Sequence, residues 1–306
     1  MQTPMVVEEL RDLKLLVLNI FLVLYLIMLS FLTFNLALLQ YTFFGHILYE
    51  GTNFVSERLQ RIPSKIIQSD ADVVALQEIY SLKHKKILVD KLKHHYPYHY
   101  YTAENFFLAM DNSMMFFSKF PIEKTLTYAF KNTNWEEYFF ARMGVMKIEL
   151  SIDNQKYSFF NVHLSAGGWS DPNSTKTRRL RSAQINELFG LVEKDKAKYK
   201  VILGDFNCGP ITSPTNYKEL VSHKSFFISE NDHITWDPEN TLNESSRYKK
   251  SKAQNIDHIL LSNSFKNSYR ILKYDTFFNK PDILIQGKRY AVSDHSGVRI
   301  ALVTKE

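Results

Sequence analysis

Short apolar runs that end in polar residues recur along the chain, and turn-forming residues separate them. DVVALQEIY (72–80), the segment 201–203, NIDHILLS (255–262) and GVRIALVT (297–304) are such runs, a pattern that predicts buried β-strands. In ARMGVMKIELSIDNQKYSFFNVHLS, Asp153 and Asn154 separate two apolar halves. This arrangement predicts two strands joined by a turn, with His163 at the end of the second strand.

Two other segments have apolar residues at helical spacing. Residues 58–68 have this spacing apart from Pro63, which would kink the helix or mark its start. In 177–193, the apolar residues Leu180, Ile185, Leu188 and Leu191 are the candidates for the buried face. Strands that alternate with helices and meanders predict an α/β sandwich of packed sheets. No linker or repeat divides residues 30–306, so we expect them to form one domain.

The N-terminal segment has a different pattern. Leu15 to Phe34 is a run of twenty residues without a charge, which is long enough to span a bilayer. No small-residue cleavage site follows, so residues 1–29 are predicted to be a tail and a retained membrane anchor. Arg11 and Lys14 precede the run, which places the tail in the cytoplasm and the rest of this single-pass protein on the other side. The alternative is that LKLLVLNIF is the first core strand.

Composition and charge add few constraints. The chain has 306 residues, of which 45% are hydrophobic and 23% charged, as expected for a folded globular protein. Cys208 is the one cysteine, which excludes an internal disulfide framework. The net charge of +6 favours phosphate-bearing or anionic partners, but it does not select among nucleic acid, lipid headgroups and nucleotides. The oligomeric state stays open.

The polar residues at the ends of the apolar runs are the candidates for a site. They are Asn35, Glu78, His163, Asp205, Asn207, Asp257, Asp294 and His295. Each alone is compatible with a turn or a helix cap, but chance explains eight of them poorly.

The chemistry of these residues is compatible with one reaction. Glu78 and Asn35 offer the oxygen ligands that magnesium accepts. His295 beside Asp294 suits a general base, and Asp205, Asn207 and His163 can form hydrogen bonds with a phosphate. The chain contains no serine or cysteine nucleophile elbow, Walker loop or Cys/His zinc motif. Hydrolysis by activated water is therefore favoured over a covalent route.

Six motifs occur in order: LTFNLALL, ALQEIY, NVHLS, GDFN, NIDHILL and SDHSGV. Together they resemble the metal-dependent endonuclease/exonuclease/phosphatase superfamily, the fold of DNase I, over nearly all of residues 30–303. The resemblance implies a four-layer αββα sandwich and a phosphodiesterase that uses Mg²⁺, or Mn²⁺ in its place.

The same resemblance implies a role for each matched residue. It implies that Glu78 and Asn35 bind the metal, and that His295, oriented by Asp294, activates water. Asp205 would orient or exchange protons with the reacting groups. The phosphate oxygens would be stabilised by Asn207 and His163, while Asp257 supports the histidine network. Asn19 also fits the first motif, but Asn35 is preferred because it precedes Glu78 by 43 residues rather than 59.

Within the superfamily, VHLSAGG with TRRLRSAQINEL, and HITWDPENTLN, resemble the neutral sphingomyelinase branch. This likeness implies a membrane phospholipid substrate that loses its phosphorylated headgroup. Basic segments such as TKTRRLR and RYKKSK favour the alternative, a nuclease or nucleotide-cleaving phosphodiesterase. A third alternative is an inactive, membrane-tethered binding module, which would require the loss of a site residue. None is lost.

Overall fold

The computed structural model describes residues 28–43, 46–103, 112–168, 170–228, 233–244, 249–278 and 280–305. Two six-stranded sheets form its centre. The first has the order β13 (Tyr269–Phe277), β16 (Gly297–Thr304), β1 (Met28–Asn35), β4 (Val73–Gln77), β6 (Met115–Ser118) and β5 (Tyr98–Tyr100). The second has the order β11 (Phe226–Ile228), β12 (Asp257–Ser262), β10 (Tyr199–Asp205), β9 (Gln155–His163), β8 (Gly144–Ile152) and β7 (Ile122–Ala129).

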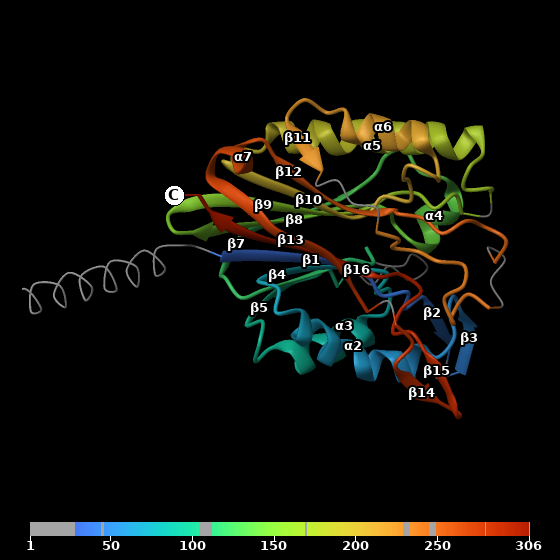
Figure 1. Ribbon diagram of the computed structural model, residues 1–306. Coiled ribbons are helices and arrows are strands. Elements are labelled where there is room, and N and C mark those ends of the chain that lie inside the picture. The colour runs from blue at the N-terminus through green and yellow to red at the C-terminus, as the bar shows by residue number, and fades with distance from the viewer. Residues whose placement is uncertain are drawn as a thin grey trace, which may run out of the picture.

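Helices cover the outer face of each sheet (Figure 1). Helices α2 (Val55–Ser69) and α3 (Leu82–Leu92) pack on the first sheet, and α5 (Thr175–Lys194) and α6 (Pro214–Val221) on the second. A third apolar cluster fills the space between the sheets, where Phe31 of β1 meets Phe159 of β9 edge to face. The predicted four-layer αββα sandwich is confirmed.

Smaller elements complete the described part of the chain. They are α4 (Trp135–Phe140), α7 (Ser264–Ser268), the hairpin of β2 (Gln40–Phe43) and β3 (His46–Glu50), and the hairpin of β14 (Ile283–Ile285) and β15 (Lys288–Tyr290).

The predicted turn between β8 and β9 is confirmed. Asp153 and Asn154 have φ of 47° and 58°, and a two-residue hairpin with both central residues left-handed matches the twist of the strands. The resulting register pairs Gly144 with His163 at the far end of the hairpin.

Strand direction brings the candidate residues to one edge. β1 and β4 are parallel, with Asn35 opposite Gln77, so Asn35 and Glu78 leave the first sheet together. β9 and β10 are also parallel, with His163 opposite Asp205, and the antiparallel β12 begins with Asp257 opposite Asp205. The two sheets therefore present their polar strand ends at the same edge.

Both predicted helices form, but with different details. Pro63 lies inside α2 and does not start it. In α5, Ile185 and Leu188 are buried as predicted, whereas Leu180 and Leu191 are only half-buried. Arg181 and Gln184 take part in the buried face, because their polar groups bind loop backbone there.

The apolar run 15–34 does not form a single membrane span. Its last seven residues belong to β1, which lies between β16 and β4 in the core. Thirteen residues of the run (15–27) precede that strand, fewer than the about 20 apolar residues that a spanning helix needs. No helix in the described ranges is long and apolar enough to cross a bilayer. Residues 1–27, which carry most of the predicted anchor and Asn19, lie outside the described residues, so the predicted topology stays a prediction.

Candidate active site

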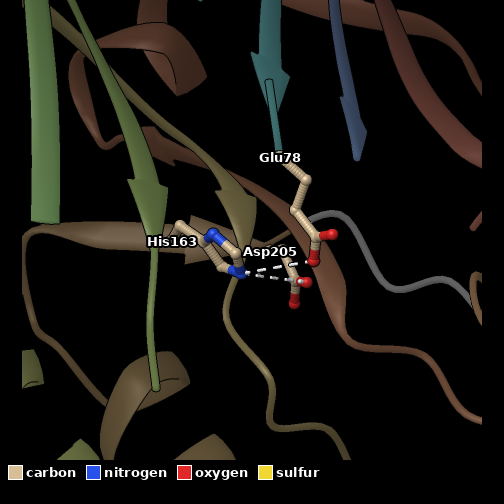
Figure 2. Close-up of side chains that lie close together, drawn as sticks. All are labelled: Glu78, His163 and Asp205. Carbon is tan, nitrogen blue, oxygen red and sulfur yellow. Dashed lines mark ion pairs between the residues drawn. The ribbon is translucent and has the colours of Figure 1, made fainter. Parts of the chain in front are cut away.

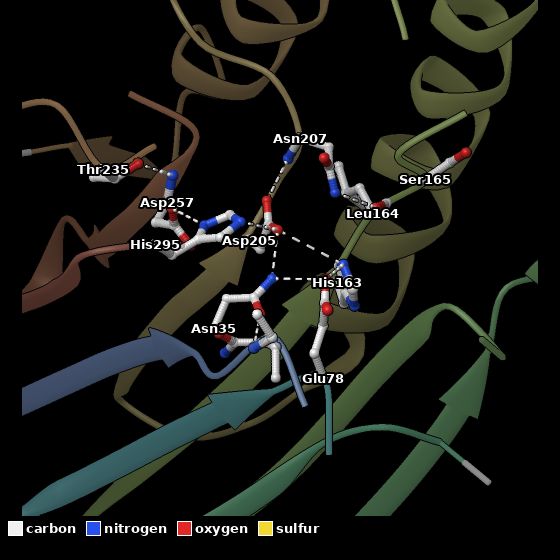
Figure 3. Close-up of polar contacts among 12 residues, drawn as sticks. Asn35, Glu78, His163, Leu164, Ser165, Asp205, Asn207, Thr235, Asp257 and His295 are labelled. Atoms are coloured by element: carbon white, nitrogen blue, oxygen red, sulfur yellow. Dashed lines mark hydrogen bonds and ion pairs between the residues drawn. The ribbon is translucent and has the colours of Figure 1, made fainter. Parts of the chain in front are cut away.

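Asn35 connects the two sheets at the polar edge (Figure 3). Its side-chain Nδ2 donates to Glu78 Oε1 and to Asp205 Oδ2, both at 3.0 Å. Its Oδ1 accepts a hydrogen bond from the backbone N–H of Ala37 at 3.0 Å. Because the amide is fully buried and all three bonds are made, Asn35 fixes the distance between two carboxylates from different sheets.

Glu78 follows β4 directly and adopts a left-handed backbone, with φ of 61°. This conformation is uncommon for a side chain other than glycine and is characteristic of functional positions. Burial and the negative charge of Asp294 raise the pKa of Glu78 to about 7, although the hydrogen bond from Asn35 opposes the shift. The side chain keeps 24% of its surface exposed. Glu78 thus lies beside other carboxylates, and part of its own side chain is accessible to a ligand.

His163 faces the same two carboxylates (Figure 2). Its Nε2 lies 3.9 Å from Glu78 Oε1 and 3.7 Å from Asp205 Oδ2. Burial lowers the pKa of His163, which favours the neutral ring. A neutral imidazole at this position can donate one hydrogen bond or ligate a metal through nitrogen.

His295 is held by Asp257. The distance from His295 Nδ1 to Asp257 Oδ2 is 2.9 Å, and both side chains are buried. Asp257 is itself held by its backbone N–H, which donates to Thr235 Oγ1 at 3.1 Å. The prediction that Asp294 orients His295 is therefore wrong. Asp294 directly precedes His295 in the chain, but the opposite sheet supplies the carboxylate at Nδ1.

The remaining ring nitrogen points into the site. His295 Nε2 lies 3.9 Å from Asp205 Oδ2. Burial opposes a charge on the ring, but Asp257, Asp205 and Asp294 together raise the pKa of His295 well above its usual value. These carboxylates therefore favour the protonated ring, and a cation bound among them would lower that pKa toward the neutral ring that accepts a proton at Nε2.

The Asp205–Asn207 loop begins where the backbone of β10 comes very close to the backbone of the neighbouring strand β9. Gly204 has φ of 151°, and a Cβ there would lie 2.0 Å from the carbonyl oxygen of Val162, so only glycine fits. Asp205 Oδ1 accepts the backbone N–H of Asn207 at 2.8 Å, and burial with the charge of Asp257 raises the pKa of Asp205. Asn207 Nδ2 donates to the carbonyl of Leu164 at 2.9 Å. Its predicted role at a phosphate oxygen stays a prediction.

A family model for the Endonuclease/Exonuclease/phosphatase family matches residues 32–295, a range that begins within β1 and ends at His295. The chain belongs to this family. Endonucleases, exonucleases and phosphatases all break phosphate ester bonds, so the predicted reaction class, phosphate ester hydrolysis, agrees with the match.

Among curated relatives, Sphingomyelinase C 1 of Leptospira interrogans is 24% identical over 229 residues, which cover 67% of this chain and 37% of the relative. The putative neutral sphingomyelinase of Drosophila melanogaster is 22% identical, covering 80% of this chain and 56% of that relative. The chain thus spans little more than a third of the first relative and about half of the second.

Solved structures share the fold. The beta toxin of Staphylococcus aureus superimposes with a TM-score of 0.69 and 19% identity, covering 89% of this chain and 99% of the toxin chain. A mutant of that toxin was solved with bound magnesium ions. TDP2 of D. rerio, complexed with a single-strand DNA product, gives a TM-score of 0.67 and 14% identity, with 90% and 98% coverage.

The donor set of this family member fits a divalent cation. Glu78, His163 and Asp205 offer ligand atoms within 4.8 Å of one another, and so do Asp205, Asp257 and His295. Burial is the main cause of the raised pKa values of Glu78 and Asp205, and the charges of Asp294 and Asp257, respectively, add to it. A cation would stabilise the charged form of both carboxylates. Asn35 directs its N–H groups at the carboxylates, so its predicted role as a metal ligand stays a prediction.

Two buried arginines support the site, and the sequence analysis did not identify them. Arg58 of α2 donates to the carbonyls of Leu36, Ala37 and Val292, which joins the loop after β1 to the segment before Asp294. Arg181 of α5 donates to the carbonyl of Asn207. The R-x-x-Q spacing in α5 was a signal for Arg181. Arg58 had none, because its acceptors are backbone groups from distant parts of the chain.

Ser293 completes the support of His295. Its Oγ donates to the carbonyl of Asn35 at 2.7 Å and accepts the backbone N–H of His295 at 3.2 Å. One hydroxyl therefore ties the loop that carries His295 to the end of β1, where Asn35 holds both carboxylates.

Proposed function

We propose that this chain is a magnesium-dependent phosphodiesterase that hydrolyses a sphingomyelin-like phospholipid and releases the phosphorylated headgroup. The observation that carries the proposal is the buried Asp257–His295 pair beside Glu78, Asp205 and His163 at one sheet edge. A base next to an acidic, cation-binding cluster is suited to the attack of water on phosphorus.

In this proposal His295 Nε2 accepts a proton from the attacking water. Asp257 holds Nδ1–H, fixes the tautomer and stabilises the imidazolium that forms. Glu78, with Asp205 beside it, would hold the magnesium ion, which when bound offsets the charge that develops on the phosphate oxygens. His163, neutral and buried, would donate to a phosphate oxygen.

The choice of a phospholipid is supported by the sphingomyelinases among the relatives and by the VHLSAGG and HITWDPENTLN segments. A nuclease is the second candidate, supported by the net charge of +6 and by the fold shared with TDP2. The same residues would act in both cases, so the difference between the candidates is the substrate alone.

The test incubates the full chain with magnesium, or with EDTA, against sphingomyelin vesicles and against plasmid and single-stranded DNA. We expect phosphocholine release that depends on magnesium, with the DNA intact. His295→Ala should be inactive on either substrate and still folded by circular dichroism. DNA cleavage without lipid turnover would show that the protein is a nuclease. Full activity of His295→Ala would refute the assignment of His295 as the base.

A further inference from the structure

Exposed apolar side chains gather on two elements beside the candidate site. They are Ile47, Leu48 and Tyr49 of β3 with Trp135, Tyr138, Phe139 and Phe140 of α4, a set that we call the aromatic rim. Each is between 43% and 69% exposed, and together they are seven of the fourteen exposed large hydrophobic residues in the described ranges. Scattered single residues would need no explanation, but a cluster of this kind marks an interaction surface.

The two parts of the aromatic rim are in contact. Tyr41 of β2 packs against Tyr49, with ring centroids 5.9 Å apart, and edge-to-face against Phe140 at 6.1 Å. Its hydroxyl donates to the carbonyl of Phe140 at 3.1 Å. In Figure 1, α4 and the β2–β3 hairpin lie on the same side of the molecule. The two elements of the aromatic rim, one attached to each sheet, therefore meet at Tyr41, Tyr49 and Phe140.

Each part is attached to a strand that carries a site residue. The β2–β3 hairpin begins five residues after Asn35, and the backbone N–H of Leu38 in between donates to the carbonyl of Glu78 at 3.1 Å. On the other side, Glu137 of α4 accepts the backbone N–H groups of Gly167 and Gly168, in the loop that follows His163. The aromatic rim therefore lies on elements that are bonded to the segments next to Glu78 and His163.

The composition of the aromatic rim favours a lipid surface as its occupant. Tyr138, Phe139 and Phe140 are consecutive and all exposed, so their side chains leave the helix about 100° apart. A partner protein would cover one face of α4, whereas a fluid apolar interface receives rings in several directions. Trp and Tyr also join an apolar body to a polar tip, which suits the boundary between lipid tails and headgroups.

We propose that the aromatic rim docks the protein on the surface of a lipid bilayer, with the candidate site facing the headgroups. This inference rests on the proposed function for the identity of the substrate, but not for the contact itself. Docking through the rim would bring phosphodiester headgroups to Glu78 and His163 without a membrane-spanning segment.

The test places a polarity-sensitive fluorophore on the rim. Leu48→Cys and Phe139→Cys are labelled with NBD in the full chain, because the one native cysteine, Cys208, is fully buried. Leu126→Cys on β7 is the control, since Leu126 is 46% exposed and belongs to neither rim element. Vesicles of sphingomyelin and phosphatidylcholine (1:1) are added in EDTA, so that no turnover is needed.

We expect a blue shift and higher emission at both rim positions and none at Leu126. Absence of a shift at the rim would overturn the proposal, whether the protein binds the vesicles through another segment or not at all. Leu48→Gln/Phe139→Gln should lower vesicle binding about tenfold and leave turnover of a soluble short-chain sphingomyelin unchanged. The matched variant Leu126→Gln/Leu272→Gln should bind as the wild type.

The outcomes separate this inference from the proposed function. A protein that docks through the rim but cleaves no sphingomyelin would refute the substrate and keep the docking surface. A rim variant that changes the sedimentation coefficient of the free protein, with no shift on vesicles, would show that a second copy covers the rim and would overturn lipid docking.

Discussion

Replacing Asp257 with Asn tests how the base is built. The substitution keeps the shape of the side chain and removes the charge that lies 2.9 Å from His295 Nδ1. Coulomb's law over that distance, at an effective dielectric constant of about 20, gives an attraction of about 6 kcal/mol between the carboxylate and a protonated ring. The transition state holds part of that proton, so we expect kcat to fall between about 10² and 10⁴-fold, which corresponds to about 3 to 5.5 kcal/mol.

The assay is phosphocholine release from sphingomyelin vesicles, with DNA cleavage measured in parallel so that the result does not depend on the substrate. Asp294→Asn should cost much less than Asp257→Asn, because Asp257 supplies the carboxylate at Nδ1. Asp90→Asn on the exposed surface of α3 is the control for an uninvolved carboxylate. Equal losses in Asp257→Asn and Asp294→Asn, or a loss below tenfold in Asp257→Asn, would refute the assignment.

Three further predictions concern the metal, the fold and acid stability. Glu78→Gln should lower kcat at least about 100-fold and abolish the protection of the fold by magnesium in thermal melts, whereas unchanged protection would remove Glu78 from the cation site. Gly204→Ala should destabilise the fold by at least about 2 kcal/mol in urea unfolding, because its Cβ would meet the carbonyl of Val162 at 2.0 Å. Gly190→Ala, on α5 with nothing within 4 Å of the new Cβ, should be neutral or stabilising. Burial lowers the pKa of His258 to about 4, so the contribution of His258 to stability should be level above pH about 6.5 and fall by roughly 3 kcal/mol between pH 6.5 and 4, as the unfolded state alone takes up the proton. The difference in unfolding free energy between the wild type and His258→Gln should therefore change by about that amount over this range, and a difference that does not vary with pH would contradict the prediction.

Much of the fold followed from local pattern. The alternation around Asp153 and Asn154 was sufficient to predict the β8–β9 hairpin, because a two-residue turn and its flanking strands are determined by neighbours in the chain. The buried strands β4, β10, β12 and β16 were also identified, since an apolar run that ends in turn residues has few other structures available. The resemblance then supplied the layers.

The limits of local pattern are seen at α5 and at the N-terminus. Arg181 is buried because it reaches the carbonyl of Asn207, a contact across 26 residues that periodicity does not reveal. The apolar run 15–34 satisfied the length criterion for a membrane span, yet its end is a central strand of the first sheet. The length of an apolar run indicates that the segment is buried, but not whether the protein core or a lipid bilayer buries it.

The sequence by itself determined which chemical groups are available and that they stand at the ends of strands. Only the tertiary structure decided how those groups pair. The carboxylate that holds His295 comes from β12, 38 residues away, rather than from the adjacent Asp294, and Asn35 joins Glu78 to Asp205 across two sheets. The physical reason is that neighbours on an extended chain direct their side chains apart, so a site at the edge of packed sheets is assembled from residues that only the folded chain brings together.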